Sequence, residues 1–224
     1  MRSHISPLTT LFVTLTLTAG CASQRTQVVD DALLSEVSPA QMSLVHQARD
    51  NQNDATDALA KAKRDNSWAK DQTDLTRAEL KSIEKELEEA KLAMVLAEQN
   101  GTATELGLSK MRFEHLTAKA DATREKLALK KREYEHAQLL QKVALERKRL
   151  AAAEVELAKA RAVQELDRVA AKKIPLREYE MQASFHRTEV ALAEVRASAA
   201  AERVAIAKQD FGTAEAKAAS FQKN

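Results

Sequence analysis

The chain has 224 residues, of which 30% are charged and 4% are aromatic, and it contains only 4 Gly and 3 Pro. So few turn-forming residues exclude a fold built from many short elements, and the composition is typical of long helices and coiled coils. The net charge of +2 argues against general nucleic-acid binding, which needs clustered excess basic residues. The single cysteine, Cys21, excludes an internal disulfide.

Residues 1–20 have the features of an export signal peptide. Arg2 and the amino terminus carry positive charge, and an uncharged stretch of about a dozen residues follows, from Leu8 to Ala19. A helix of that length is too short to span a bilayer core of roughly 30 Å. We therefore expect this segment to be removed and not to act as a membrane anchor.

The end of this segment, residues 17–21 (LTAGC), resembles the lipobox of bacterial lipoproteins, although Thr18 stands where that family most often has leucine. The resemblance implies cleavage between Gly20 and Cys21. It also implies that Cys21 carries a thioether-linked diacylglycerol and an amide-linked acyl chain such as palmitate. In enteric-type lipoproteins an aspartate after the cysteine favours inner-membrane retention, so Ala22 implies sorting to the outer membrane, facing the periplasm. An ordinary secretory signal with an incidental cysteine remains the alternative.

Residues 21–37 are mixed and polar and are predicted to form a tether between the lipid and the body of the protein. A short apolar group, Ala32-Leu33-Leu34, can dock on the body and shorten the reach of this tether. The segment from Ser38 to Gln41 predicts a helix start, because Ser38 can cap, Pro39 suits the first helical position and Gln41 completes a capping box.

The first helix is predicted over residues 39–99. It ends at Asn100-Gly101, because glycine tolerates the left-handed conformation that closes many helices. Two rows of residues repeat every seven positions along it and together form the seam of a left-handed coiled coil. The rows are Val45, Gln52, Leu59, Asn66, Thr73, Leu80, Leu87, Met94 and Ala48, Ala55, Ala62, Ala69, Thr76, Ile83, Ala90, Ala97. Polar seam residues such as Asn66 can fix register or oligomeric state, which makes self-association plausible.

Two further helices are predicted over residues 103–173 and 176–209. The second helix gains an additional apolar row after about residue 139, and a helix needs two stripes only if two neighbours cover it. Pro175 interrupts the pattern. If the chain reverses there, the third helix lies back along the second; the alternative is one kinked helix of about 105 residues. Gly212-Thr213 is predicted to end the third helix, which leaves residues 211–224 as a C-terminal tail.

These elements predict an all-α fold. Its body, residues 38–210, is a long antiparallel helical hairpin of coiled-coil type. The third helix is expected to pack on the half of the hairpin that lies nearer the membrane.

Candidate chemistry is sparse. Glu133 and His136 have the Glu-x-x-His spacing of di-iron helical bundles, but His46, His115 and His186 have no glutamate three residues before them. No nucleophile and base can be placed together, and no glycine-rich loop can cradle phosphate. We expect a non-enzymatic protein with no metal, no small-molecule substrate and no cofactor other than the lipid on Cys21. A metal-dependent helical bundle is the alternative.

Candidate partner contacts lie at two places. The only tryptophan, Trp68, is off the seam of the first helix. We expect it to pack beneath the end of the third helix, near Phe211; if it is exposed, it becomes a candidate anchor for a partner. The second place is the hairpin tip, with Asn100, Gly101, Leu106 and Leu108.

The sequence therefore predicts a lipid-anchored envelope protein that serves as a coiled-coil spacer, scaffold or docking element at the outer membrane. It would bind a protein partner or a second copy of itself. An alternative is an accessory of an export or efflux machine that docks through the hairpin tip. Such hairpins are similar in architecture to periplasmic adaptors of these machines, but this chain lacks the β-rich domains of those adaptors.

Overall fold

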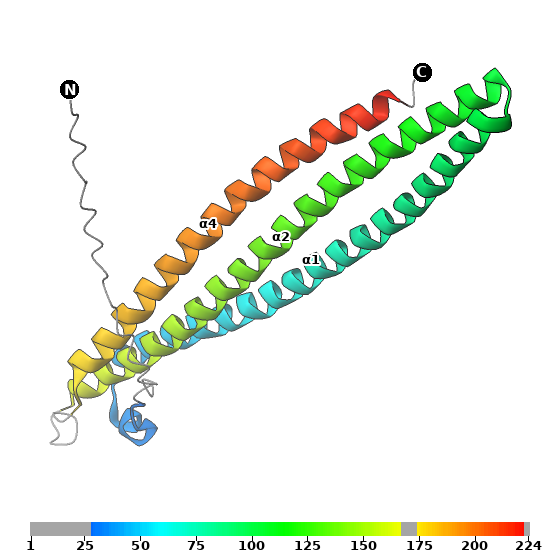
Figure 1. The fold of residues 1–224 in the computed structure, drawn as a ribbon. Coiled ribbons are helices and arrows are strands. Elements are labelled where there is room, and N and C mark those ends of the chain that lie inside the picture. The colour runs from blue at the N-terminus through cyan, green and yellow to red at the C-terminus, as the bar shows by residue number, and fades with distance from the viewer. Residues whose placement is uncertain (1–27, 167–173, 222–224) are drawn as a thin grey trace, which may run out of the picture.

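The computed structural model of the protein describes residues 28–166 and 174–221 (Figure 1). A short 3-10 helix, η1 (Asp31–Glu36), precedes three long helices: α1 (Pro39–Asn100), α2 (Ala103–Gln164) and α4 (Leu176–Ser220). No strand occurs within these two described stretches. The predicted all-α class, with a helical hairpin and a third helix packed on it, is confirmed.

The middle position in the structure belongs to α2. It packs along α1 on one side and along α4 on the other, while α1 and α4 scarcely touch, so the helices form a row (Figure 1). This arrangement explains the two apolar stripes of α2, because each stripe faces a different neighbour. In the second stripe Val143, Leu157 and Val163 are buried, as expected for a face covered by another helix.

The predicted seam of α1 is confirmed, since every residue of its two rows is buried or half-buried. On α4 a row with steps of three and four residues, from Leu176 to Phe211, is likewise buried or half-buried and faces α2. Many of these positions are alanines, among them Ala90 and Ala183, which are almost completely buried, as is Ala120 of α2. Small residues at these positions let the helix backbones approach closely, so that shallow contacts repeated over a long distance hold the helices together.

Polar residues within the first seam fix the register of the hairpin. The Asn66 side-chain amide donates to the amide oxygen of Gln141 at 2.7 Å. The hydroxyl of Thr73 lies 2.9 Å from the carbonyl oxygen of Ala69 in its own helix and 3.1 Å from that of Lys130 on α2. These seam residues are therefore engaged within the chain, and they give no support to self-association through this face.

Three ion pairs fix the register of α2 against α4. Arg147 pairs with Glu194, Glu154 with Arg187 and Arg161 with Glu180, at 2.6, 2.8 and 3.0 Å. Both sets of partners are spaced by seven residues, and the sign of the charge alternates along each helix. A slip of one heptad would place Arg147 opposite Arg187, so the charges favour one register only.

The same pairs show that α2 and α4 are antiparallel. The chain therefore reverses before α4, and the alternative of one kinked helix is wrong. Pro175 is the N-cap of α4, and Glu178 donates its backbone N–H to the Pro175 carbonyl at 2.8 Å.

Two predicted helix ends are wrong. The end of α2 is Gln164 and not residue 173; residues 167–173 lie outside the described part of the chain. At the other end, α4 continues through Gly212-Thr213 to Ser220, where a tail from residue 211 was predicted. The seam explains this continuation, because Ala214 and Ala218 extend the half-buried row that faces α2. Consequently α4 packs along more of α2 than the predicted half (Figure 1).

The tip needs a glycine for a reason other than the predicted one. Gly101 has an extended conformation with φ −91°, not a left-handed one. A Cβ at this position would lie 2.7 Å from the carbonyl oxygen of Ala97, so only glycine fits beside the preceding turn. Thr102 and Glu105 then form a capping box that starts α2, in the same way that Ser38 and Gln41 start α1.

Overpacking of the alanine seam should destabilise the protein. We expect Ala120→Leu, at a site with no exposed surface, to lower the free energy of unfolding by about 1–3 kcal/mol. Ala128→Leu, at an exposed site on the same helix, should change it by less than about 0.5 kcal/mol. Urea unfolding followed by circular dichroism measures both. Equal effects of the two substitutions would contradict close packing at the seam.

Candidate functional site

The base of the rod, where α1 begins and α2 ends, holds the N-terminal segment in place. Val29, Leu34 and Val37 are buried in one apolar cluster with side chains of α1, α2 and α4, and η1 lies beside the end of α2 (Figure 1). The cluster members from the long helices are Val45, Ala153, Leu157, Ala160, Ala162, Val163, Tyr179 and Ala183. The segment from residue 28 to residue 37 is therefore part of the folded body.

A buried charged group on α2 completes this attachment. The Lys159 ammonium, with a side chain only 8% exposed, lies 2.9 Å from a carboxylate oxygen of Asp31 and 3.0 Å from one of Glu156. The other carboxylate oxygen of Glu156 accepts a hydrogen bond of 2.8 Å from the Val29 backbone N–H. We call Asp31, Glu156 and Lys159 the base latch, because they connect the N-terminal segment to α2.

The base latch perturbs the ionisation of Asp31 and Lys159. The hydrogen bond and charge of Lys159 hold the pKa of Asp31 below its ordinary value. Burial opposes the positive charge of Lys159, but the hydrogen bonds that its ammonium donates to Asp31 and Glu156 outweigh burial and leave the Lys159 pKa raised. Nearby, burial raises the pKa of the Tyr179 hydroxyl, and the charge of Glu156 adds to that shift. Asp31 and Lys159 therefore keep their opposite charges over the neutral pH range.

The latch revises the predicted tether. Residues 28–37 are docked, as the apolar group Ala32-Leu33-Leu34 allowed, and the predicted tether thus keeps only residues 21–27, which lie outside the described part of the chain. Seven residues from Cys21 to Val28 span at most about 25 Å when fully extended. Cys21 and the cleavage position at Gly20 also lie outside the described residues.

Trp68 is not packed beneath α4, and that prediction is wrong. Its side chain is 61% exposed. It lies two positions after Asn66 of the seam and thus points away from α2, whereas α4 lies on the far side of α2. Leu75 follows one heptad later on the same face and is 63% exposed. The structure therefore leaves Trp68 as a candidate anchor for a partner.

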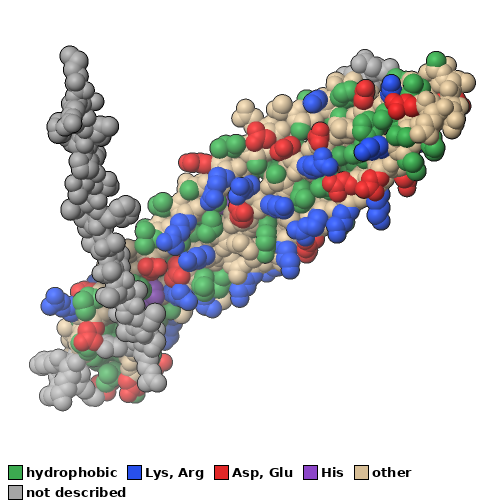
Figure 2. Space-filling view, viewed as in Figure 1, with side chains coloured by type: hydrophobic (Ala, Val, Ile, Leu, Met, Phe, Trp, Pro, Cys, Tyr) green, Lys and Arg blue, Asp and Glu red, His purple; other side chains and the backbone are tan. Residues whose placement is uncertain are grey.

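The hairpin tip is the second exposed apolar region. Asn100, Gly101 and Leu108 are exposed, and Leu106 is half-buried. Four further exposed apolar side chains, which were not predicted as partner contacts, lie near them on both helices: Leu92, Val95, Leu96 and Met111. Hydrophobic side chains are visible at this end of the rod in the space-filling view (Figure 2). A helical period of three and four residues, from Leu92 to Leu96 and from Leu108 to Met111, was the signal that could have found them.

The Glu133–His136 pair does not lie in a metal-binding group. Glu133 is bound by the Lys130 ammonium at 2.7 Å. His136 lines an open groove between α2 and α4 together with Leu140 and Arg147. Within residues 28–166 and 174–221, no three or more His, Cys, Asp or Glu side chains gather as metal ligands would.

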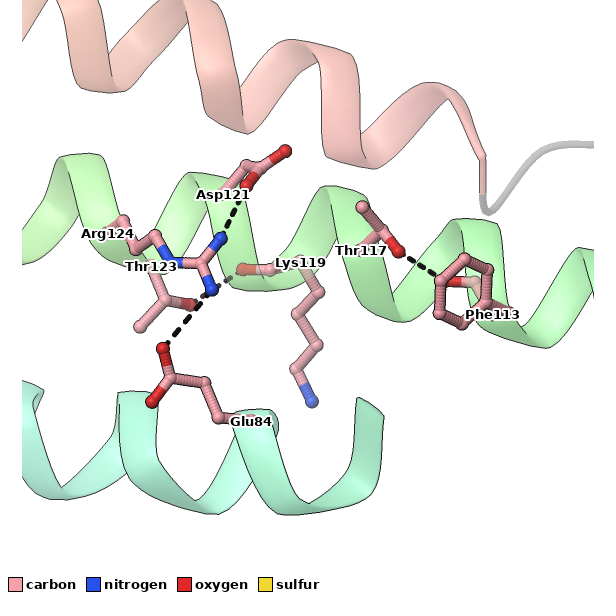
Figure 3. A network of polar contacts seen from close by, with 7 residues as sticks. All are labelled: Glu84, Phe113, Thr117, Lys119, Asp121, Thr123 and Arg124. Carbon is pink, nitrogen blue, oxygen red and sulfur yellow. Dashed lines mark hydrogen bonds and ion pairs between the residues drawn. The ribbon is translucent and has the colours of Figure 1, made fainter. Parts of the chain in front are cut away.

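A polar network near the end of α4 joins α1 to α2 (Figure 3). The Arg124 guanidinium binds Glu84 of α1 at 3.2 Å and Asp121 of its own helix at 2.8 Å. Thr117 and Thr123 donate to carbonyl oxygens four residues earlier, both at 2.8 Å. The charged side chains are about half exposed, so we interpret the network as structural support of the hairpin.

No family of known proteins matches the chain, and neither a curated protein nor a solved structure is significantly similar to it. Among the described helices, none is both long enough and apolar enough to cross a membrane.

Removal of the buried ammonium should release the N-terminal segment. Lys159→Met leaves Glu156 buried beside no cation, which costs about 1–3 kcal/mol. We expect the Val29 amide hydrogen, and those of residues 33 and 37, to exchange with solvent at least about tenfold faster. Arg161→Met, which removes an exposed ion pair two residues away, is the matched control and should leave this exchange unchanged. Unchanged exchange in both variants would contradict the latch.

The latch should be insensitive to pH near neutrality. Because the pKa of Asp31 is lowered from 3.8, its contribution is present above that pH and is lost as the pH falls through the lowered value. Because the pKa of Lys159 is raised from 10.5, its contribution persists up to that pH and is lost only as the pH rises further. The NMR shift of the Asp31 carboxyl carbon should therefore stay constant between the two limits, and a transition near neutral pH would contradict the assignment.

Proposed function

We propose that the protein is a non-enzymatic, lipid-anchored component of the bacterial envelope. Its helical rod serves as a spacer, scaffold or docking element at the outer membrane. The proposal combines the lipobox-like residues 17–21, which imply a lipid on Cys21, with an extended body whose charged clusters are explained by helix pairing.

The base latch is the observation that carries this proposal. A long flexible tether would leave the rod free to move far from its lipid, whereas the docked segment holds residue 28 at one end of the rod. With about 25 Å of chain between Cys21 and Val28, the lipid can be close only to this end. The hairpin tip is remote from it, since the 62 residues of α1 span about 93 Å at 1.5 Å per residue.

Mass spectrometry of the mature N-terminus tests the proposal. We expect the chain to begin at Cys21 and to carry the mass of a diacylglycerol and an amide-linked acyl chain. More than one acyl chain makes membrane attachment stable, so the protein should remain in the membrane fraction. Cys21→Ser should abolish the modification and the recovery of the protein in the membrane fraction. An unmodified N-terminus at another residue would defeat the proposal.

A docking role of the tip in an export or efflux machine is the second candidate function. The observation that favours it is the exposed apolar set at the tip, where α4 no longer covers α2. Isolated apolar residues are common on surfaces, but a cluster at the far end of a rod suits a partner contact. Trp68 on the side of the rod is a separate candidate contact.

A photo-crosslinking residue in place of Leu108 tests this role in cells. We expect it to capture an outer-membrane export or efflux protein, because an exposed apolar side chain at a docking tip becomes buried on binding. The matched control is the same residue in place of Ser82, an exposed position in the middle of the rod. Equal capture at both positions would contradict tip docking.

A further inference from the structure

The outer face of α4 carries a second heptad seam that nothing in the described chain covers. All five large apolar side chains that are exposed on α4 lie in one row along the helix. Three other residues complete this row, so that its members follow one another at alternating steps of four and three residues. We call this row the outer seam: Met181, Phe185, Thr188, Leu192, Val195, Ala199, Glu202 and Ile206. Its large apolar members are 46–68% exposed.

The chain cannot cover the outer seam with its own helices. Each of its residues lies two positions after a residue that faces α2, and two residues turn an α-helix by about 200°. The outer seam therefore points away from α2, on the side of α4 opposite to the rest of the row (Figure 1). Singly scattered apolar residues on a surface need no explanation, but a row with the coiled-coil period does.

The two flanks of the outer seam differ in a way that suits a partner helix. One flank has only small residues: Ser184, Ala191, Ser198 and Ala205. The other flank is charged and carries Glu189, Arg196 and Arg203. Neither Glu189 nor Arg196 belongs to any ion pair within the described residues. The small residues permit close approach of a second helix, and the unpaired charges of Glu189 and Arg196 can bind opposite charges on that helix.

We propose that the outer seam binds the outer seam of a second copy of this chain, with the two α4 helices antiparallel. In this register Leu192 of one helix lies opposite Val195 of the other, and Ile206 lies opposite Met181. Between these layers Ala199 lies opposite Thr188 and Glu202 lies opposite Phe185. Each layer occurs twice, as a two-fold axis requires.

Charge complementarity selects the second copy and the antiparallel direction. In the antiparallel register Glu189 lies beside Arg196 of the other helix, twice, while the small flanks face each other. In a parallel pair the two copies of Glu202 would meet in the same seam layer, where like charges repel. The charged flank would then face the small flank, which offers Glu189 no cation.

The area is sufficient for a specific contact. The proposed register overlaps the two α4 helices over about 35 residues, or roughly 50 Å. A strip of that length and about 10 Å wide on each helix buries roughly 1,000 Å² in total, which is the lower limit for a specific interface. We therefore expect a reversible dimer with a dissociation constant in the micromolar range.

The outer seam lies on the described body, so the dimer does not require the lipid. In the lipidated protein the two bases lie about 50 Å apart along the pair, so both lipids reach one membrane when the rods lie along its surface. All tests therefore use the full mature chain with Cys21→Ser, so failure of the lipid proposal leaves them unaffected. Sedimentation equilibrium at about 100 µM should show a dimer. A monomer at that concentration, whether because the seam serves a different partner or none, would overturn the proposal.

Matched substitutions test the surface. Val195→Asp, at a site 68% exposed in the free chain, should weaken the dimer at least about tenfold, since a charge would be buried in the central layer. Leu75→Asp, at a site on α1 that is 63% exposed, should leave it unchanged. Both sites are exposed, so circular dichroism should show the same helix content. An equal effect of the two variants would contradict docking through α4.

Charge exchange and crosslinking test the register. Glu189→Arg should weaken the dimer several-fold, and the double variant Glu189→Arg/Arg196→Glu should restore it. On oxidation, the double variant Met181→Cys/Ile206→Cys should form disulfide-linked dimers, whereas either single variant should form none, because the two positions are about 38 Å apart along the helix. Crosslinking of the single variants would indicate a parallel pair and overturn the antiparallel arrangement.

Discussion

Close approach of helix backbones through small side chains is the constraint on which this structure depends. Each alanine in a seam buries little area, so no short contact between two helices would be stable. Repetition of the contact over some 60 residues of α1 and α2 compensates for its shallowness. It also determines the shape of the protein, because only long helices that lie side by side can repeat one contact so often. A rod with few aromatic residues and no deep core is the direct result.

Alanine seams stabilise the pairing of two helices but specify its register poorly, since one small residue fits a groove much like another. The polar and charged contacts supply what the seams lack. Asn66 with Gln141 and Thr73 with Lys130 align α1 with α2. The alternating charges at intervals of seven do the same for α2 and α4. Each exposed pair adds only about 0–1 kcal/mol, yet a shifted register turns several attractions into repulsions at once.

The sequence was informative wherever one periodicity decided the outcome. The heptads of α1, the double stripe of α2 and the seam of α4 predicted the three helices and their partners. Predictions failed where tertiary contacts mattered. Gly212 lowers the stability of the helix only slightly, and the packing of Ala214 and Ala218 against α2 outweighs this loss. Trp68 was placed on the wrong side of the rod, because the position of a residue along its helix does not reveal whether three helices form a triangle or a row. Docking of residues 28–37 was predicted only in part, from the apolar group Ala32-Leu33-Leu34. The sequence pattern does not distinguish the buried Lys159, which adds to the apolar contacts, from its exposed neighbours.

A row of three helices has two outer faces, and the difference between them limits the assembly. The outer face of α4 carries apolar residues with a heptad period, whereas the corresponding face of α1 in the half near the base is exposed and polar: Gln47, Asp50, Asp54, Asp57, Lys61 and Arg64. A third rod could not pack on such a face without burying unpaired charges. Contact through α4 alone uses the same surface of both copies, so it closes after two chains and does not propagate into a filament. The asymmetry of the row thus favours a closed pair, and the apolar residues near the tip stay outside its overlap, available for a different protein.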